Sequence, residues 1–283
     1  MRPVLEEQKN NGLKTLYIVV IIICAISIGV GVYLQFFSEE KLDVILGINQ
    51  DDSKDKELEL ENQFGSIFTN QLDVLDNTQI NVKKEDANEI VYAKFNKSIQ
   101  KDNCTIDVKI PYINIDEETT KRFNTEIQNE FKSKVESIYS SASKSQDKYI
   151  YTVNYKAYVQ NDILSLIIKS ELKENDSEQQ VTIKTYNYNL KDSREEKLED
   201  LLNLKDIEIE TANKKIQDTI KNKQEKNKNL TELGYNVYQR DLASSIYYVN
   251  NSEVYLYGEN GTIYIIYAYG NLDFTSEMDL VIL

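Results

Sequence analysis

The chain has 283 residues, a formal net charge of −14 and no histidine, and its only cysteines are Cys24 and Cys104. An acidic protein repels nucleic acid and anionic headgroups, so we expect no nucleic-acid partner; the charge either attracts cationic partners or serves solubility alone. The lack of histidine excludes Ser-His-Asp and Cys-His catalytic sites and any zinc site that uses histidine. We expect no cofactor, no metal site and no disulfide, and therefore a fold that depends on its hydrophobic core.

The stretch Leu16–Phe37 contains no charged residue. As a helix rising about 1.5 Å per residue it would span roughly 33 Å, close to the thickness of a bilayer's hydrocarbon core. Tyr17 and Tyr33 lie near its ends, where amphipathic rings prefer the headgroup region. The sequence predicts a transmembrane helix. A buried core helix and a cleaved signal peptide are the alternatives, but the run exceeds a typical signal core and no Ala-x-Ala-like cleavage site follows it.

Basic residues flank this span unequally. Three precede it, whereas only Lys41 lies shortly after it, beside two glutamates. The positive-inside rule then places residues 1–15 in the cytoplasm and residues 38–283 outside the cell membrane, which the protein would cross once. A cytoplasmic tail of this length is too short to bury a core of its own.

Residues 38–88 have the pattern of a stalk between the membrane and the outer domain. Within them, apolar residues at helical spacing predict an amphipathic helix over Glu57–Leu75. This helix can dock on the outer domain, pair with a second copy in a homodimer, or lie on the membrane. Its polar face is not basic, which disfavours the membrane.

Residues 89–190 alternate between strand and helix patterns. We expect a strand through Cys104–Ile110 that ends at Pro111, then an amphipathic helix over Asp116–Ser140 with Asp116 as its N-cap. Alternating residues predict three further strands, which begin at Tyr149, Leu164 and Val181. These strands would form an antiparallel meander with a helix before it. The row of tyrosines in these strands fits a half-buried face, or else forms a carbohydrate or peptide platform.

Residues 191–283 repeat the alternation. A helical turn at Leu198–Leu204 precedes an amphipathic helix that starts at Asp206 and ends in a lysine run. Asn260-Gly261 predicts a hairpin in which both residues take positive φ. We expect the second strand of this hairpin to be central in its sheet, and Met278–Leu283 to form a last short strand. The lysines form a solvated helix end or an anchor to an anionic wall polymer; they are Lys221, Lys223, Lys226 and Lys228.

The expected fold class is therefore α+β: an N-terminal transmembrane helix, then antiparallel sheets with packed amphipathic helices. From about Lys97 to the C-terminus the sequence also resembles an extracytoplasmic module of lysozyme-sensing anti-sigma-V factors and of certain peptidoglycan deacetylases. The segments that carry the likeness are Ile110-Pro111-Tyr112-Ile113, Phe123-Asn124, Asn161–Leu166, Tyr186–Lys191 and Leu198–Leu202. The resemblance implies an α+β domain that binds a ligand at the cell surface, which in the sensors is the cationic enzyme lysozyme.

Two features separate this chain from those relatives. Residues 1–15 cannot supply a sigma-binding region, and the deacetylases need histidine to bind their metal. We therefore expect a non-catalytic, membrane-anchored binding or sensor module of the bacterial cell envelope, with a cationic protein or a cell-wall component as ligand. An envelope enzyme or enzyme accessory acting on peptidoglycan, and an assembly component that dimerises through its stalk, are the alternatives. The sequence identifies no catalytic, metal-binding or ligand-binding residue.

Overall fold

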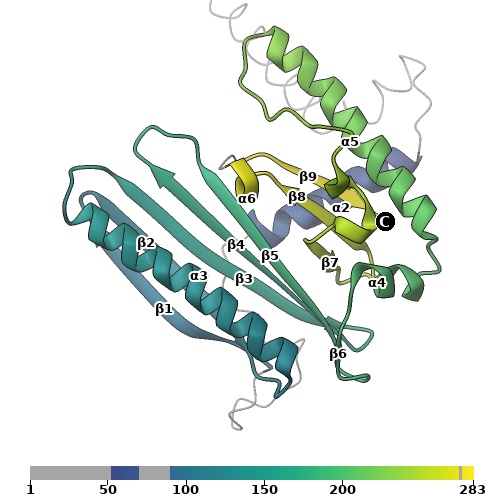
Figure 1. The fold of residues 1–283 in the computed structure, drawn as a ribbon, viewed down its shortest axis with the longest axis horizontal. Coiled ribbons are helices and arrows are strands. Elements are labelled where there is room, and N and C mark those ends of the chain that lie inside the picture. Colours follow the sequence, from purple (N-terminus) through teal and green to yellow (C-terminus); the bar gives the residue numbers. More distant parts are fainter. Residues whose placement is uncertain (1–51, 70–89, 274–275) are drawn as a thin grey trace, which may run out of the picture. The chain divides into compact units, whose positions relative to one another are not determined.

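The computed structural model describes residues 52–69, 90–273 and 276–283 (Figure 1). By its internal contacts the chain divides into residues 1–59 and residues 60–283. Of the first unit only the beginning of helix α2 (Asp52–Thr69) is described, so the fold below is that of the second. The predicted membrane helix Leu16–Phe37 lies outside the described residues. No helix in the described ranges is long and apolar enough to cross a bilayer.

The larger sheet in the described part of the chain has six strands in the order β1-β2-β3-β4-β5-β6. The predicted α+β class is confirmed, but the sheet is mixed, because β2 and β3 are parallel while all other neighbours are antiparallel. Helix α3 (Glu118–Ala142) makes the crossover that a parallel pair requires. The strands are β1 (Val91–Lys101), β2 (Cys104–Ile113), β3 (Tyr149–Gln160), β4 (Ile163–Glu174), β5 (Gln180–Asn189) and β6 (Arg194–Glu195).

Strand β2 continues through Pro111 to Ile113, so the expectation that proline ends it was wrong. Proline has no N–H to offer a neighbouring strand. Its partner β1 shifts register between Ala93 and Phe95, directly opposite Pro111. A bulge at this point lets the pairing resume on both sides of the missing donor.

Helix α3 covers one face of the large sheet (Figure 1). Ile127, Phe131 and Val135 are buried at helical spacing and pack on β2, β3 and β4. The predicted N-cap was wrong by one residue: Glu117 occupies that position without a capping bond, and Asp116 pairs with Lys121 at 2.6 Å.

The tyrosine row belongs to the core beneath α3. Tyr151, Tyr186 and Tyr188 are buried there, and the ring of Phe123 stacks on that of Tyr186 with their centroids 4.6 Å apart. The half-buried-face interpretation therefore holds, and these three rings are not an exposed platform.

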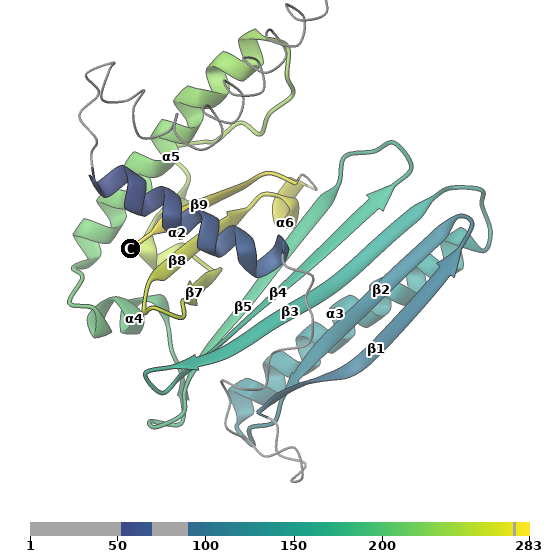
Figure 2. The same ribbon diagram turned by 180° about the vertical axis from the view of Figure 1, so that it is seen from behind.

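A second sheet, three-stranded within the described residues, runs in the order β7-β8-β9. Its strands are β7 (Tyr255–Tyr257), β8 (Ile263–Ala268) and β9 (Met278–Ile282), all antiparallel. Every residue of β8 is buried, as expected for a central strand. One face packs on α4 (Leu198–Leu204) and α5 (Ile209–Glu232), and the other on β4, β5 and the Leu60–Phe64 part of α2 (Figure 2).

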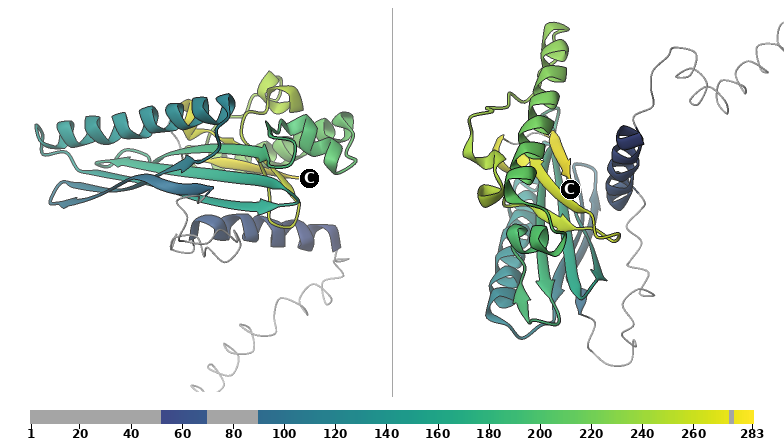
Figure 3. Two further views of the ribbon diagram at one scale, coloured as in Figure 1. Left: turned by 90° about the horizontal axis from the view of Figure 1, so that it is seen from below. Right: turned by 90° about the vertical axis from the view of Figure 1, so that its right-hand side faces the viewer.

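Helix α5 differs from its prediction at both ends. It begins at Ile209 and not at Asp206, which has φ +54°. It continues past the lysine run to Glu232, although only Ala212, Ile216 and Ile220 are buried along it. Its second half therefore rises past the body of the domain with little packing (Figure 3).

A charged network is buried where β9 meets the loop after α5. The guanidinium of Arg240 donates to both carboxylate oxygens of Asp279, at 2.5 and 2.8 Å, and the Tyr269 hydroxyl donates to the same carboxylate at 2.6 Å. Tyr247 and Tyr269 hydroxyls lie 3.0 Å apart. Because each charge has an opposite partner, their attraction offsets part of the cost of desolvating both.

Candidate binding pocket

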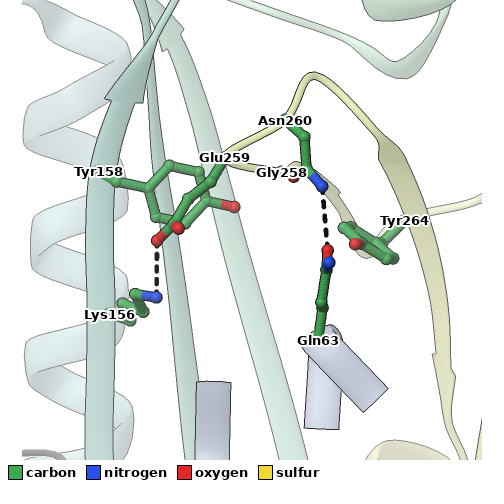
Figure 4. A pocket seen from close by; sticks show the side chains of 7 residues that line it. All are labelled: Gln63, Lys156, Tyr158, Gly258, Glu259, Asn260 and Tyr264. Carbon is green, nitrogen blue, oxygen red and sulfur yellow. Dashed lines mark hydrogen bonds and ion pairs between the residues drawn. The ribbon is translucent and has the colours of Figure 1, made fainter. Parts of the chain in front are cut away.

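A cavity of about 330 Å³ lies between β3, the β7–β8 turn and α2 (Figure 4). We call it the turn pocket. It is lined by Gln63, Lys156, Tyr158, Gly258, Glu259, Asn260 and Tyr264. This volume falls in the range that accommodates small ligands in proteins. Strand β3 contributes two of the side chains, because residues two apart in a strand share a face.

The hydroxyl of Tyr158 is the group in this pocket that most directly indicates ligand binding. Only 3% of the residue is exposed, and its hydroxyl has no hydrogen-bond partner among the described residues. Figure 4 shows the ring reaching from β3 into the space between two polar pairs. Burial raises the pKa of Tyr158 well above its usual value, so the hydroxyl is neutral and able both to donate and to accept. A buried hydroxyl left unpaired costs about 1–3 kcal/mol, which a ligand atom or a water would recover.

Two polar pairs flank this hydroxyl (Figure 4). Lys156 Nζ lies 2.7 Å from a carboxylate oxygen of Glu259, and Asn260 Nδ2 donates to Gln63 Oε1 at 2.9 Å. Both members of the ion pair are about one-third or more exposed, so the pair itself adds little to stability. It does cancel the charge of the pocket, which leaves neutral donors and acceptors to meet a ligand.

The backbone of the β7–β8 turn explains why glycine stands at both of its ends. A Cβ on Gly258 would lie 2.6 Å from the ring of Tyr264, and Gly261 has φ +73°. The predicted hairpin is confirmed by the antiparallel pairing of β7 with β8, but Asn260 does not have positive φ, so the expected conformation of that residue was wrong. The N–H of Gly261 donates to the carbonyl of Gly258 at 2.9 Å, closing a four-residue turn in which only the last residue is left-handed.

Helix α2 forms one wall of the turn pocket. Phe64 is buried with its ring centroid 5.3 Å from that of Tyr264, and Glu61 pairs with Lys223 of α5 at 3.6 Å. The predicted amphipathic helix could dock on the outer domain, pair with a second copy or lie on the membrane. In the structure, the Leu60–Phe64 part of α2 docks on the domain.

The polar side chains that line the turn pocket are one lysine, one glutamate, two amides and two tyrosines. The carboxylate is paired with the lysine, and the pocket contains no serine, threonine or cysteine nucleophile. In the described ranges no cluster of three or more cysteine, aspartate or glutamate side chains could hold a metal ion. The free thiol of Cys104 is buried in the core under α3, where burial raises its pKa.

None of these residues stands out as part of a site from the sequence alone. The signal present was on β3, where Tyr158 is a large aromatic residue on the otherwise more polar face that carries Thr152, Asn154 and Lys156. What the face meets is decided by pairing between segments more than ninety residues apart, which no local pattern reveals.

No family model matches this chain, and no curated protein matches it. A solved structure with some likeness is that of a DUF3298 family member from Bacteroides fragilis NCTC 9343, at a TM-score of 0.35 and 13% identity. The alignment covers 64% of this chain and 81% of that one. The likeness is too distant to assign a function.

Proposed function

We propose that this protein is a membrane-anchored, extracytoplasmic binding module of the cell envelope that recognises a neutral, hydroxyl-bearing cell-wall fragment in the turn pocket. The observation that carries the proposal is the buried Tyr158 hydroxyl, which lacks a partner among the described residues inside a cavity large enough for a small ligand. A saccharide hydroxyl or an amide would complete its hydrogen bonding.

The electrostatics of the pocket support a neutral ligand over a charged one. Lys156 and Glu259 already pair with each other, so a ligand carrying a formal charge would meet no unpaired opposite charge among the lining side chains. The amides of Gln63 and Asn260 supply both donors and acceptors, the groups that recognise sugars and peptides. The absence of a described nucleophile-and-base pair in the pocket favours binding without turnover.

The wall formed by α2 gives this module a route for sensing. Gln63 and Phe64 hold α2 to the β7–β8 region, and α2 follows the predicted membrane span along the chain. A ligand that binds beside Gln63 and Asn260 would change how firmly α2 is held. By linkage, if the ligand strengthens the docking of α2 by a given free energy, docking of α2 strengthens ligand binding by the same free energy.

Calorimetric titration of the full-length chain in lipid nanodiscs with soluble glycan-peptide fragments of cell wall tests the binding. We expect saturable heat with the parent chain and about 5- to 100-fold weaker binding for Tyr158→Phe, which removes one hydroxyl. Tyr248→Phe is the matched control, because Tyr248 is 43% exposed and lies outside the pocket. Equal affinities for both variants, or no heat with any fragment, would refute the pocket as the site.

A labelling experiment tests the topology. Asp176→Cys places a thiol in the exposed β4–β5 turn, while the native Cys104 is only 1% exposed and gives little background. A membrane-impermeant maleimide should label this variant on intact cells and in lysed cells equally. Labelling only after lysis would refute the outward orientation.

The negative charge of the chain favours a second ligand class, a cationic protein. Binding of lysozyme, measured at low and high salt, tests this. Affinity that falls steeply with salt but is unchanged by Tyr158→Phe would assign recognition to the acidic surface instead of the pocket.

A further inference from the structure

The free end of α5 carries an exposed apolar cluster. Leu230, Leu233 and Tyr235 are 40%, 74% and 62% exposed, and every residue from 228 to 236 is exposed. We call Leu230, Leu233 and Tyr235 the α5 tip. Single exposed apolar residues are ordinary, but three gathered at the end of a helix that projects from the body mark an interaction surface (Figure 3).

The α5 tip is fixed by a well-defined helix ending. The N–H of Tyr235 donates to the carbonyl of Leu230 at 3.0 Å, and the N–H of Gly234 donates to that of Thr231 at 2.9 Å. With Gly234 at φ +87°, this is a Schellman motif. The motif turns the chain back so that Tyr235 returns beside Leu230, and the cluster is therefore held together without support from the rest of the domain.

The charge next to the tip is opposite to that of the protein. Residues 221–235 carry four lysines and two glutamates, whereas the whole chain has a net charge of −14. Lys223 pairs with Glu61, but Lys221, Lys226 and Lys228 are exposed and form no ion pair among the described residues. Apolar side chains at an end flanked by lysines are the combination that binds the surface of an anionic bilayer.

We propose that the α5 tip inserts into the surface of the anionic bilayer in which the chain is anchored, with Lys226 and Lys228 meeting lipid phosphates. The inference rests on the anchor in the proposed function. Between Phe37 and α2 lie residues 38–51, which can extend at most about 50 Å, so the domain stays near the membrane. Because tethering of this length gives an effective concentration on the order of millimolar, three apolar side chains and two lysines suffice.

The test uses the full-length chain, with Cys24→Ala, in nanodiscs of phosphatidylcholine with or without phosphatidylglycerol. A polarity-sensitive fluorophore is attached at Thr231→Cys, between the tip leucines, and a control fluorophore at Glu136→Cys, exposed on α3. We expect blue-shifted emission and quenching by nitroxide lipids for the tip probe only, growing with phosphatidylglycerol content. Changing Lys226 and Lys228 to glutamine should weaken the phosphatidylglycerol dependence by about fivefold per lysine.

Three outcomes would overturn the inference. In the first, the tip probe remains as water-exposed as the control. In the second, its emission shifts as much in discs of phosphatidylcholine alone as in discs with phosphatidylglycerol, and as much in the Leu230→Ser/Leu233→Ser variant as in the parent chain. In the third, the shift depends on the number of chains per disc, which would assign the tip to contact with a second copy. Recovery of the chain in the nanodisc fraction is scored separately. A chain that fails to incorporate at all refutes the anchor, whereas incorporation without a tip signal refutes only the tip.

Discussion

The side-chain amide of Asn124 pairs with both peptide groups of Ile113. Its Oδ1 accepts the N–H at 2.9 Å, and its Nδ2 donates to the carbonyl at 2.8 Å. Strand β3 pairs with β2 only as far as Val108, so the far end of β2 would otherwise present unpaired peptide groups inside the core. The same device recurs where Asn271 pairs with both peptide groups of Ile183, at 3.1 Å each, on the free edge of β5.

Replacing Asn124 with alanine should therefore destabilise the protein far more than an ordinary helix substitution. Two peptide groups of a fully buried residue lose their partners, at a cost of about 2–4 kcal/mol in the free energy of unfolding. Urea denaturation followed by circular dichroism measures this. Asn129→Ala, at an exposed position of the same helix, is the control and should change stability by less than about 0.5 kcal/mol. Equal effects of the two variants would contradict the argument.

The buried pair of Arg240 and Asp279 should show strong non-additivity. Arg240 and Asp279 are 6% and 1% exposed, so Arg240→Met leaves a buried carboxylate without its cation and should cost about 3–5 kcal/mol. The double variant Arg240→Met/Asp279→Leu removes both charges and should be more stable than either single variant. A double-mutant cycle by urea denaturation measures the coupling, and additive losses would show that the charges do not depend on each other.

The pattern of the sequence predicted most of the helices and strands, but little of how the strands pair and how the layers pack. Alternation located β3, β4 and the central strand β8, and helical spacing located α3 and α4, because each buries one or two faces that local order reveals. The antiparallel meander of β3, β4 and β5 is confirmed. The parallel pairing of β2 with β3 is non-local, so a sheet that is antiparallel throughout was the simpler expectation. The register shift opposite Pro111 likewise depends on the neighbouring strand.

The turn pocket could not be predicted from the sequence, because it also depends on non-local contacts. Its residues come from α2, β3, the β7–β8 turn and β8, and they form no recognisable motif. Both faces of β4 are apolar, with Leu164 and Leu166 on one and Ile163 and Ile167 on the other. This double pattern indicates a second layer behind the sheet, but it does not say which segment supplies that layer.

Tyr158→Phe should leave the stability of the unliganded protein unchanged or raise it by about 1 kcal/mol, because it removes a buried hydroxyl that has no partner among the described residues. Tyr267→Phe is the matched comparison. Its hydroxyl lies 3.0 Å from that of Ser252, so its loss should destabilise by about 1 kcal/mol. Urea midpoints of the two variants measure the contrast. A clear destabilisation by Tyr158→Phe would show that its hydroxyl is already satisfied.

Stability should fall between about pH 10 and about pH 12, where buried tyrosines keep protons that the unfolded chain releases. Burial raises the pKa of Tyr255 to about 12 and that of Tyr267 to about 12, from 10.0. The unfolded chain releases these protons near pH 10 and the folded chain does not, so the stabilisation is complete below pH 10 and decreases as pH rises from 10 towards 12. Each tyrosine contributes a slope of up to about 1.4 kcal/mol per pH unit.

Urea denaturation between about pH 8 and about pH 11, with phenolate absorbance recorded in parallel, measures this dependence. The variant Tyr255→Phe/Tyr267→Phe should have a shallower alkaline slope than the parent chain. Normal titration of all tyrosines near pH 10 in the folded protein would contradict the assignment.

Phe64→Ala should release α2 from the domain without unfolding the domain itself. Phe64 is 2% exposed and is the buried side chain of α2 in the cluster with Tyr264, so its loss removes about 3–5 kcal/mol of packing. The remaining contacts of α2 with the domain include a hydrogen bond between two exposed side chains and an ion pair that is about one-third exposed, and such contacts are individually weak. Amide hydrogen exchange should then accelerate in α2 while β8 and β9 retain their protection. Leu58→Ala is the control, because Leu58 is 56% exposed, and it should leave exchange in α2 unchanged.

If ligand binding holds α2 in place, saturating ligand should partly restore the protection of α2 against exchange in the Phe64→Ala variant. A ligand that binds with full affinity yet leaves the exchange of α2 unchanged would separate binding from sensing.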